Sequence, residues 1–240
     1  MRAFQRLIRR EEADTGQRRI DLRRECNLML RAGGGPRFDA KDVDAIRAYY
    51  RRYGLVCVRD GLTPKTHQMI LRATRNVTPT HDVRQNSRLT TCLPRRISRH
   101  VYADPLLRRL FGQLHDFPLQ ESSFPMEFRT YPSDSSGMAW HKDLRLTQPK
   151  QTEMVYTVHN DNSASRLVWK IEGGSQVSVR PQRGDLVFVL PDRADHQVTS
   201  MRGGGGTRSI LKFIAHPHSA RKLKQFDVEK KQALSTAKKK

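Results

Sequence analysis

The sequence predicts a mainly β protein with flanking helices, built on a double-stranded β-helix (jelly roll) core. Two observations lead to this fold class. Residues 121–216 contain about eight short apolar segments separated by Gly-, Pro-, Ser- and Asp-rich turns, the spacing typical of a sandwich or barrel. Residues 39–120 instead contain segments whose apolar residues recur at helical spacing. With 240 residues, the chain is long enough for one sizeable domain with appendages.

Four regions follow from these patterns. Residues 1–38 are predicted to form a basic N-terminal arm, which is loosely helical to residue 32 and is broken by the run Gly33–Pro36. Residues 39–120 form a helical support region with a short strand, and residues 121–216 form the jelly-roll core. Residues 217–240 are polar and Lys-rich, and they are predicted to be disordered.

The support region is predicted to alternate helices with one strand. A helix over residues 39–53 ends at Gly54, and a short buried strand follows at 55–58. Thr63 and Pro64 are typical of a helix start, so a second helix is predicted to run to about residue 76. Residues 77–100 show no clear period. A third helix is predicted at 104–114, where large apolar residues fall on one side.

The core strands are predicted from short apolar runs bounded by turn residues. They are expected at residues 128–131, 138–143, 153–159, 165–171, 176–180, 185–190, 196–201 and 208–215.

The charge of the chain favours acidic partners. The formal net charge is +21 and the isoelectric point is about 10.7. Residues 1–40 contribute +4 and residues 221–240 contribute +6, which leaves +11 for residues 41–220. We expect the basic termini to bind a polyanion such as nucleic acid, although the charge could equally serve solubility.

Cysteine usage and hydropathy indicate an intracellular protein. The three cysteines, Cys26, Cys57 and Cys92, form no Cys-x-x-Cys pair, so neither a disulfide scaffold nor a zinc knuckle is expected. No apolar run reaches the length of a membrane span, and the N-terminus has no apolar region of a secretory signal. We therefore expect a cytoplasmic or nuclear location, without secretion and without membrane contact.

The stretch from residue 126 to residue 143 predicts a metal site. Turn residues at 132–137 separate two strands, and the second carries His141 and Asp143. Residues two apart on a strand point to the same face, so an imidazole and a carboxylate would project together. One more histidine would complete the two-His, one-carboxylate triad that suits non-haem Fe(II). His196 is the preferred third ligand, with His159 as its rival.

Other polar residues have simpler interpretations. His216-Pro217-His218 follows the last strand and is expected to be a loop, and His81-Asp82 is expected to be solvated. Trp140 is expected in the core or at the rim of the pocket beside His141.

These motifs together resemble a known family. His141-x-Asp143, then His196, then Arg208 on the last strand resembles the pattern of the 2-oxoglutarate- and Fe(II)-dependent oxygenases, in particular the prolyl-hydroxylase-like members. Residues 54–64 and the phrase from Arg180 to Leu190 before the second histidine also resemble that family, and the resemblance covers residues 40–216.

The resemblance implies a set of ligands and roles. His141, Asp143 and His196 would hold Fe(II), while 2-oxoglutarate and dioxygen would be co-substrates and ascorbate an additional reductant. Arg208 would bind the far carboxylate of 2-oxoglutarate, because a guanidinium offers a planar fork. Lys212 shares its strand face and competes for this role. Tyr131 would hydrogen-bond the co-substrate.

The implied activity is hydroxylation or oxidative demethylation of an unidentified substrate, either a protein side chain, a nucleic acid or a small molecule. Two alternatives remain. One is a basic nucleic-acid-binding or scaffold protein whose jelly-roll body carries a vestigial metal site. The other is a cupin-type metalloenzyme that does not use 2-oxoglutarate and so would not need Arg208.

Overall fold

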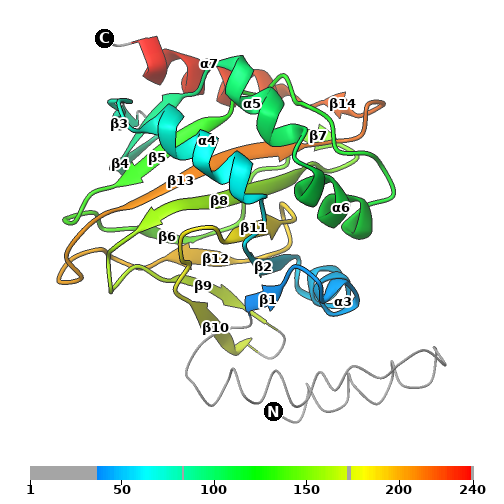
Figure 1. The fold of residues 1–240 in the computed structure, drawn as a ribbon, viewed down its shortest axis with the longest axis horizontal. Helices are drawn as coiled ribbons and strands as arrows, with labels where there is room; N and C mark the ends of the chain where they lie inside the picture. The colour runs from blue at the N-terminus through cyan, green and yellow to red at the C-terminus, as the bar shows by residue number, and fades with distance from the viewer. Residues whose placement is uncertain (1–36, 83, 172–173, 239–240) are drawn as a thin grey trace.

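Two facing sheets with a helical layer on the outside form the body of the protein (Figure 1). The computed structural model describes residues 37–238, except residues 83, 172 and 173. The predicted helical arm at residues 1–32 therefore lies outside the described residues. A sandwich of two sheets with flanking helices confirms the predicted class, a mainly β jelly roll with flanking helices.

The larger sheet has eight strands and the smaller one has four. In spatial order the larger sheet contains β1 (Arg37–Asp39), β2 (Leu55–Arg59), β11 (Leu186–Val189), β8 (Thr152–Asn160), β13 (Arg208–Ala215), β5 (Glu127–Tyr131), β4 (Gln85–Cys92) and β3 (Thr80–Asp82). The smaller sheet contains β10 (Gln176–Val179), β9 (Leu167–Lys170), β12 (His196–Val198) and β6 (Met138–His141). A further short pair joins β14 (Arg221–Lys222) to β7 (Thr147–Gln148).

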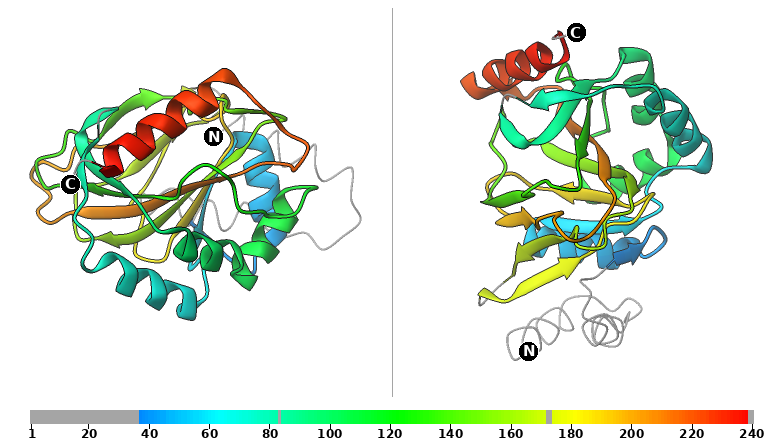
Figure 2. Two further views of the ribbon diagram at one scale, coloured as in Figure 1. Left: turned by 90° about the horizontal axis from the view of Figure 1, so that it is seen from above. Right: turned by 90° about the vertical axis from the view of Figure 1, so that its left-hand side faces the viewer.

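Strand alternation gives the larger sheet two different faces. On β13, Arg208, Ile210 and Lys212 point toward the smaller sheet and line a cavity between the sheets. Phe213 points the other way, and its ring packs 5.6 Å from that of Tyr102 in the helical layer. The cavity and the helical layer therefore lie on opposite faces of one sheet. The right-hand view of Figure 2 shows the helical layer and the smaller sheet on opposite sides of the larger sheet.

Capping residues set the helix starts that the sequence predicts. The helices are α3 (Val43–Tyr53), α4 (Pro64–Thr74), α5 (Arg95–Tyr102), α6 (Pro105–Leu114) and α7 (Lys224–Lys238). Thr63 caps α4, with its side chain accepting from the Thr66 N–H, and Asp104 caps α6. The Asp104 carboxylate also accepts from the Thr63 hydroxyl at 2.6 Å. One buried carboxylate thus connects the starts of α4 and α6.

Residues 77–100 are not the unpatterned stretch that the sequence indicates. They form β3, β4 and α5. Polar residues on these strands are buried in ion pairs: Asp82 is 1% exposed and accepts from Arg88 at 2.7 Å and from Thr90 at 2.9 Å. The expectation of a solvated His81-Asp82 is therefore wrong for Asp82, because paired charge replaces apolar contact in this part of the sheet.

The expectation of a disordered C-terminal tail is also wrong. Residues 221–222 form β14, and α7 begins at Lys224. Phe226 is fully buried in a small cluster with Phe124, Leu146 and Ile214. Figure 2 shows α7 at the top of the molecule, and it contacts β4 and β3 at one edge of the larger sheet. A few apolar residues hold this otherwise Lys-rich segment against the body.

The boundary of the N-terminal arm differs from the prediction. Residues 37 and 38 belong to β1, which pairs in parallel with β2, so the predicted arm extends too far. Arg37 donates to Asp185 at 2.6 Å and fixes β1 to the turn before β11.

Cys57 and Cys92 are free, as predicted. Among the described helices, none has both the length and the apolar content needed to cross a bilayer.

Candidate metal and co-substrate site

The turn between β5 and β6 positions the first metal-ligand candidate. Gly137 has φ +75 and lies so close to β12 that a Cβ there would collide with the Val198 and Thr199 carbonyls. Ser135 accepts from the Gly137 N–H at 3.1 Å and closes the turn. This close approach lets β6 pair with β12, in the register that places His141 opposite His196.

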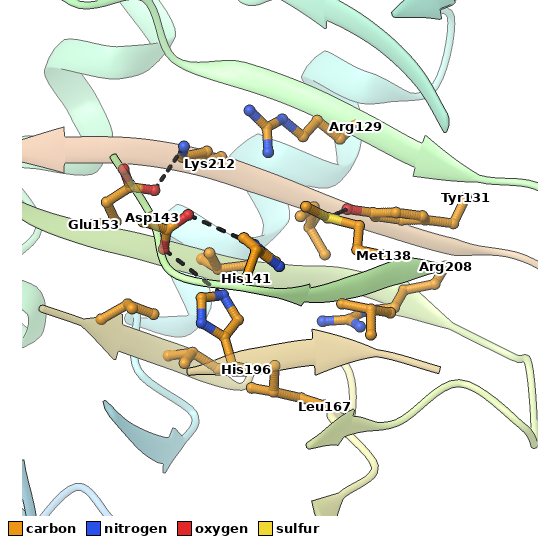
Figure 3. Close-up of a pocket in the computed structure, with 15 residues that line it drawn as sticks. Arg129, Tyr131, Met138, His141, Asp143, Glu153, Leu167, His196, Arg208 and Lys212 are labelled. Atoms are coloured by element: carbon orange, nitrogen blue, oxygen red, sulfur yellow. Dashed lines mark hydrogen bonds and ion pairs between the residues drawn. The ribbon is translucent and has the colours of Figure 1, made fainter. Parts of the chain in front are cut away.

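The structure brings His141, Asp143 and His196 together, and we call these three residues the triad. Their ligand atoms all lie within 4.8 Å of one another. The two imidazole rings are 4.3 Å apart between centroids. Oxygens of Asp143 lie 3.8 Å from Nε2 of His141 and 3.7 Å from Nε2 of His196. These separations are too long for hydrogen bonds, so the carboxylate faces both rings without bonding to either (Figure 3).

Asp143 reaches the site differently from the prediction. The sequence predicts one strand through residue 143, but β6 ends at His141. Asp143 lies in the following loop, where its backbone carbonyl accepts from the Asp192 N–H at 3.3 Å. Paired strands thus supply the two histidines, whereas a loop supplies the carboxylate.

Backbone contacts orient both imidazoles. Nδ1 of His141 lies 2.8 Å from the Ala139 carbonyl oxygen, and Nδ1 of His196 lies 3.0 Å from that of Ala194. A carbonyl oxygen only accepts, so each Nδ1 carries a proton, and in the neutral imidazole Nε2 then keeps its lone pair. Both lone pairs face the Asp143 carboxylate. Burial and the neighbouring His196 lower the pKa of His141, which favours the neutral imidazole that ligates metals.

A buried ion pair lies beside Asp143. Lys212 on β13 donates to Glu153 on β8 at 2.6 Å, and Glu153 is 2% exposed. Burial and the nearby Asp143 raise the pKa of Glu153. Burial would also raise the pKa of Asp143, but Lys212 and the two histidines outweigh it and hold that pKa below its ordinary value. Asp143 therefore stays a carboxylate, yet no described side chain donates a hydrogen bond to it.

Arg208 is the unpaired cation of the cavity. It pairs across β13 and β5 with Tyr131 and is 2% exposed. Its Nε and Nη1 are buried and have no hydrogen-bond partner among the described residues. Burial lowers its pKa. Lys212, the competitor for the carboxylate-binding role, is already neutralised by Glu153, so the structure separates the two cations clearly.

Tyr131 lies beside Arg208, where the sequence places it. The Tyr131 hydroxyl donates to the Met138 sulfur at 3.1 Å, a weak acceptor. The cavity is lined by the triad, Arg208 and Tyr131 together with apolar residues of both sheets. The predicted site residues therefore meet in one place.

Sequence reasoning missed two charged residues of this cavity. Glu153 has a signal in the sequence, an acid within an apolar strand on the same face as Val155. Arg129 also lines the cavity, two residues before Tyr131 on β5, and donates to Glu127 at 2.5 Å. Its Nε is buried without a hydrogen-bond partner among the described residues.

The rival residues lie elsewhere. His159 forms an ion pair with Asp161 at 2.6 Å and does not reach the triad. His216 follows β13 in a loop, as predicted, with its ring near Phe226. Trp140 is half-buried, and Nζ of Lys170 lies over its ring, 4.6 Å from the ring centroid.

Comparisons with known proteins support the fold. No protein-family model matches the sequence, and no curated protein matches it. Solved structures do match. The α-ketoglutarate-dependent epimerase SnoN from nogalamycin biosynthesis is 16% identical, with a TM-score of 0.62, covering 75% of this chain and 84% of SnoN.

Two further structures are similar. A prolyl-4-hydroxylase from Pseudomonas putida is 15% identical, with a TM-score of 0.56, covering 74% of this chain and 100% of that one. HygX from Streptomyces hygroscopicus, solved with nickel, 2-oxoglutarate and hygromycin B, is 10% identical, with a TM-score of 0.54, covering 72% and 87%. The chain therefore has the fold of the 2-oxoglutarate- and Fe(II)-dependent oxygenases, as the resemblance in the sequence predicts.

Proposed function

We propose that this protein is an Fe(II)- and 2-oxoglutarate-dependent dioxygenase. The observation that carries the proposal is the buried, unpaired Arg208 guanidinium in the same cavity as the triad. The fold alone would not decide the activity, since one fold hosts many functions. A 2-oxo diacid that chelates a metal needs two things from its site. It needs a metal held by protein ligands at one end and a cation for its second carboxylate at the other, and this cavity contains residues suited to both.

The donor set suits Fe(II). Two neutral imidazoles and one carboxylate on one side of an ion form the facial triad of non-haem iron oxygenases. Bound iron would supply dioxygen activation, driven by oxidative decarboxylation of 2-oxoglutarate.

The residues of the chain would bind the metal ion and 2-oxoglutarate, orient them and exclude water. His141, Asp143 and His196 would hold the ion through Nε2, a carboxylate oxygen and Nε2. Arg208 would bind the far carboxylate of 2-oxoglutarate through one edge of its guanidinium, with the Tyr131 hydroxyl as a further donor. The Glu153–Lys212 pair holds Lys212 beside Asp143 and so helps to keep that ligand ionised.

The co-substrate would lie between apolar walls. Val187, Val189 and Ile210 line the cavity beside the polar residues. Such walls exclude water and strengthen the interactions of the co-substrate with Arg208.

A test that needs no substrate follows from this assignment. The purified protein with Fe(II) should convert 2-oxoglutarate slowly to succinate in air. Anaerobic addition of Fe(II) and 2-oxoglutarate should give a visible charge-transfer band. If neither succinate nor the band appears with the intact chain, while Fe(II) binding is shown by calorimetry, the cupin-type alternative without 2-oxoglutarate replaces the proposal.

The reaction on the substrate is proposed more coarsely, as hydroxylation or oxidative demethylation of a C–H bond. HygX binds hygromycin B and SnoN acts in nogalamycin biosynthesis, so the fold accepts small molecules as well as the peptides suggested by a prolyl-4-hydroxylase. A mass-spectrometric screen for a gain of one oxygen or loss of one methyl group, with and without 2-oxoglutarate, would separate the two reactions.

A further inference from the structure

We propose that the outer surface of α4, α5 and α6 binds the phosphate backbone of a nucleic acid duplex. These three helices contain no Asp or Glu. Their exposed positions carry seven cations, which we call the basic helical face: Lys65, Arg72, Arg95, Arg96, Arg99, Arg108 and Arg109.

The helices present these cations together on one side of the molecule. α5 packs against both α4 and α6, and Figure 1 shows the three side by side over the larger sheet. On α5 the buried positions are Ile97, Ser98, Val101 and Tyr102. Every other residue of α5 is Arg or His and is exposed. The basic helical face therefore points to solvent along the whole of α5.

The stability of the helices does not explain this composition. Arg95 and Arg99 are four residues apart, a spacing at which like charges destabilise a helix. Among the described residues, Glu121 alone pairs with the basic helical face, at 3.4 Å from Arg95 and 3.7 Å from Arg99. A surface that serves solubility usually carries both signs interspersed. An external polyanion would relieve the repulsion.

The residue types favour a duplex over an acidic protein. Six of the seven cations are Arg, whose planar fork binds phosphate bidentately. Protein interfaces centre on aromatic residues and Arg packed in desolvated pockets, so an Arg-rich surface without exposed aromatic or large apolar residues is a poor match for one. The large hydrophobic residues that are exposed among the described residues, Leu144, Val228 and Leu234, all lie outside these helices.

The same surface disfavours a single strand. Binding of single strands relies on exposed aromatic rings that stack on bases. Tyr102 and Phe111 are buried, so α5 and α6 offer no such platform. Backbone contact without base stacking describes the binding of a duplex by its phosphates.

The basic helical face lies away from the catalytic cavity. Phe213 and Tyr156 on the outer face of the larger sheet contact Tyr102 and His67 of the helical layer. The cavity opens on the opposite face of that sheet. A bound duplex would therefore leave the triad accessible, and duplex binding does not depend on the proposed oxygenase activity.

Two charge-matched variants of the full chain test the proposal. The first replaces Arg72, Arg96 and Arg109 with Gln; these residues are exposed and lack ion pairs among the described residues. The control replaces three exposed cations elsewhere, Arg51, Lys224 and Lys231, with Gln. Both variants lose three charges and keep residues 1–36, so net charge and the basic arm are the same in each.

The measurement is fluorescence anisotropy of a labelled 20-base-pair DNA duplex as a function of salt. Each phosphate contact contributes about −0.9 to the log–log salt slope and about fivefold in affinity at 0.15 M salt. The first variant should bind about a hundredfold more weakly than the intact chain, with a slope less negative by about 2.7. The control should stay within about threefold, and both should keep the 2-oxoglutarate turnover of the intact chain.

Three results would overturn the proposal. Equal losses in the two variants would mean that net charge, rather than the basic helical face, binds DNA. If no duplex binding is detected at low salt, a nucleic acid duplex is not the ligand of the basic helical face. Displacement of the duplex by polyglutamate at equal charge concentration would instead indicate an acidic protein partner.

Discussion

Replacing Arg208 with Leu should abolish tight binding of 2-oxoglutarate. Nε and Nη1 of Arg208 are both buried and have no hydrogen-bond partner among the described residues, and a carboxylate at either edge of the guanidinium could accept from one of them together with Nη2. Each hydrogen bond to a charged group is worth about 1.5–3 kcal/mol, which gives about 3–6 kcal/mol for two bonds. Because about 1.4 kcal/mol corresponds to a factor of ten, the dissociation constant should rise by about 10² to 10⁴. Anaerobic titration of the iron-loaded protein, followed by calorimetry, measures this change.

In the absence of 2-oxoglutarate, the same substitution should preserve or increase the stability of the protein. The intact chain buries a guanidinium whose charge has no partner among the described residues, and Arg208→Leu removes that cost. The variant should therefore be at least as stable as the intact chain in the absence of 2-oxoglutarate. Adding the ligand at 100 times its dissociation constant for the intact chain should stabilise the intact chain by about 2.7 kcal/mol but the variant by about 0.4 kcal/mol or less.

Lys212→Leu is the matched control, since both cations lie on one face of β13. It would leave Glu153 buried without its partner and should destabilise the protein by about 3–5 kcal/mol. The stabilisation by 2-oxoglutarate should survive in this variant. If Arg208→Leu keeps the ligand response and Lys212→Leu loses it, the assignment of Arg208 is wrong.

Three further predictions address the triad, the C-terminal helix and the buried carboxylate of β3. Alanine at any residue of the triad should abolish iron-dependent succinate formation with little change in the melting temperature of the metal-free protein, whereas substantial turnover after Asp143→Ala would contradict the assignment. Phe226→Ala should cost about 3–5 kcal/mol in urea denaturation, against about 0.5 kcal/mol or less for the exposed Val228→Ala on the same helix; equal costs would mean that α7 adds no core. Burial would raise the pKa of Asp82, but its arginine partners outweigh it and hold the pKa well below the ordinary value, so this carboxylate stabilises the fold above about pH 4 and loses that effect as the pH falls through its lowered pKa. The loss of stability in Asp82→Asn should therefore be largest near pH 7 and shrink in acid, and a loss independent of pH would refute the ion-pair explanation.

The core strands were predictable because their apolar residues are contiguous or alternate. β11 and β13 are almost wholly buried and read directly as strands. β4 was not predictable, because its polar residues face a buried charge cluster around Asp82 that comes from another strand. α7 was missed for a similar reason. Phe226 and Ala233 are fully buried but stand among lysines, and their partners lie far away in the sequence.

The site was predictable to the extent that spacing fixes it. His141 and His196 lie on paired strands, and Arg208 begins the last strand. The choice between Arg208 and Lys212 could not be settled from spacing, because both share a strand face. The decisive residue is Glu153, which lies on β8, pairs with Lys212 and leaves Arg208 as the cation without a counter-ion.

Two of the unsatisfied groups of the cavity, on Asp143 and Arg208, together argue against a vestigial site. Asp143 is a carboxylate to which no described residue donates, and Arg208 is a guanidinium from which two nitrogens donate to no described residue. Either group alone would cost stability, and they do not pair with each other. A cation held by the triad would compensate the first group, and an anion would compensate the second. A molecule that binds a metal at one end and carries a carboxylate at the other satisfies both at once, which is the chemistry of 2-oxoglutarate. Stability alone would favour an apolar residue at position 208, which supports the proposal that this buried arginine binds a ligand.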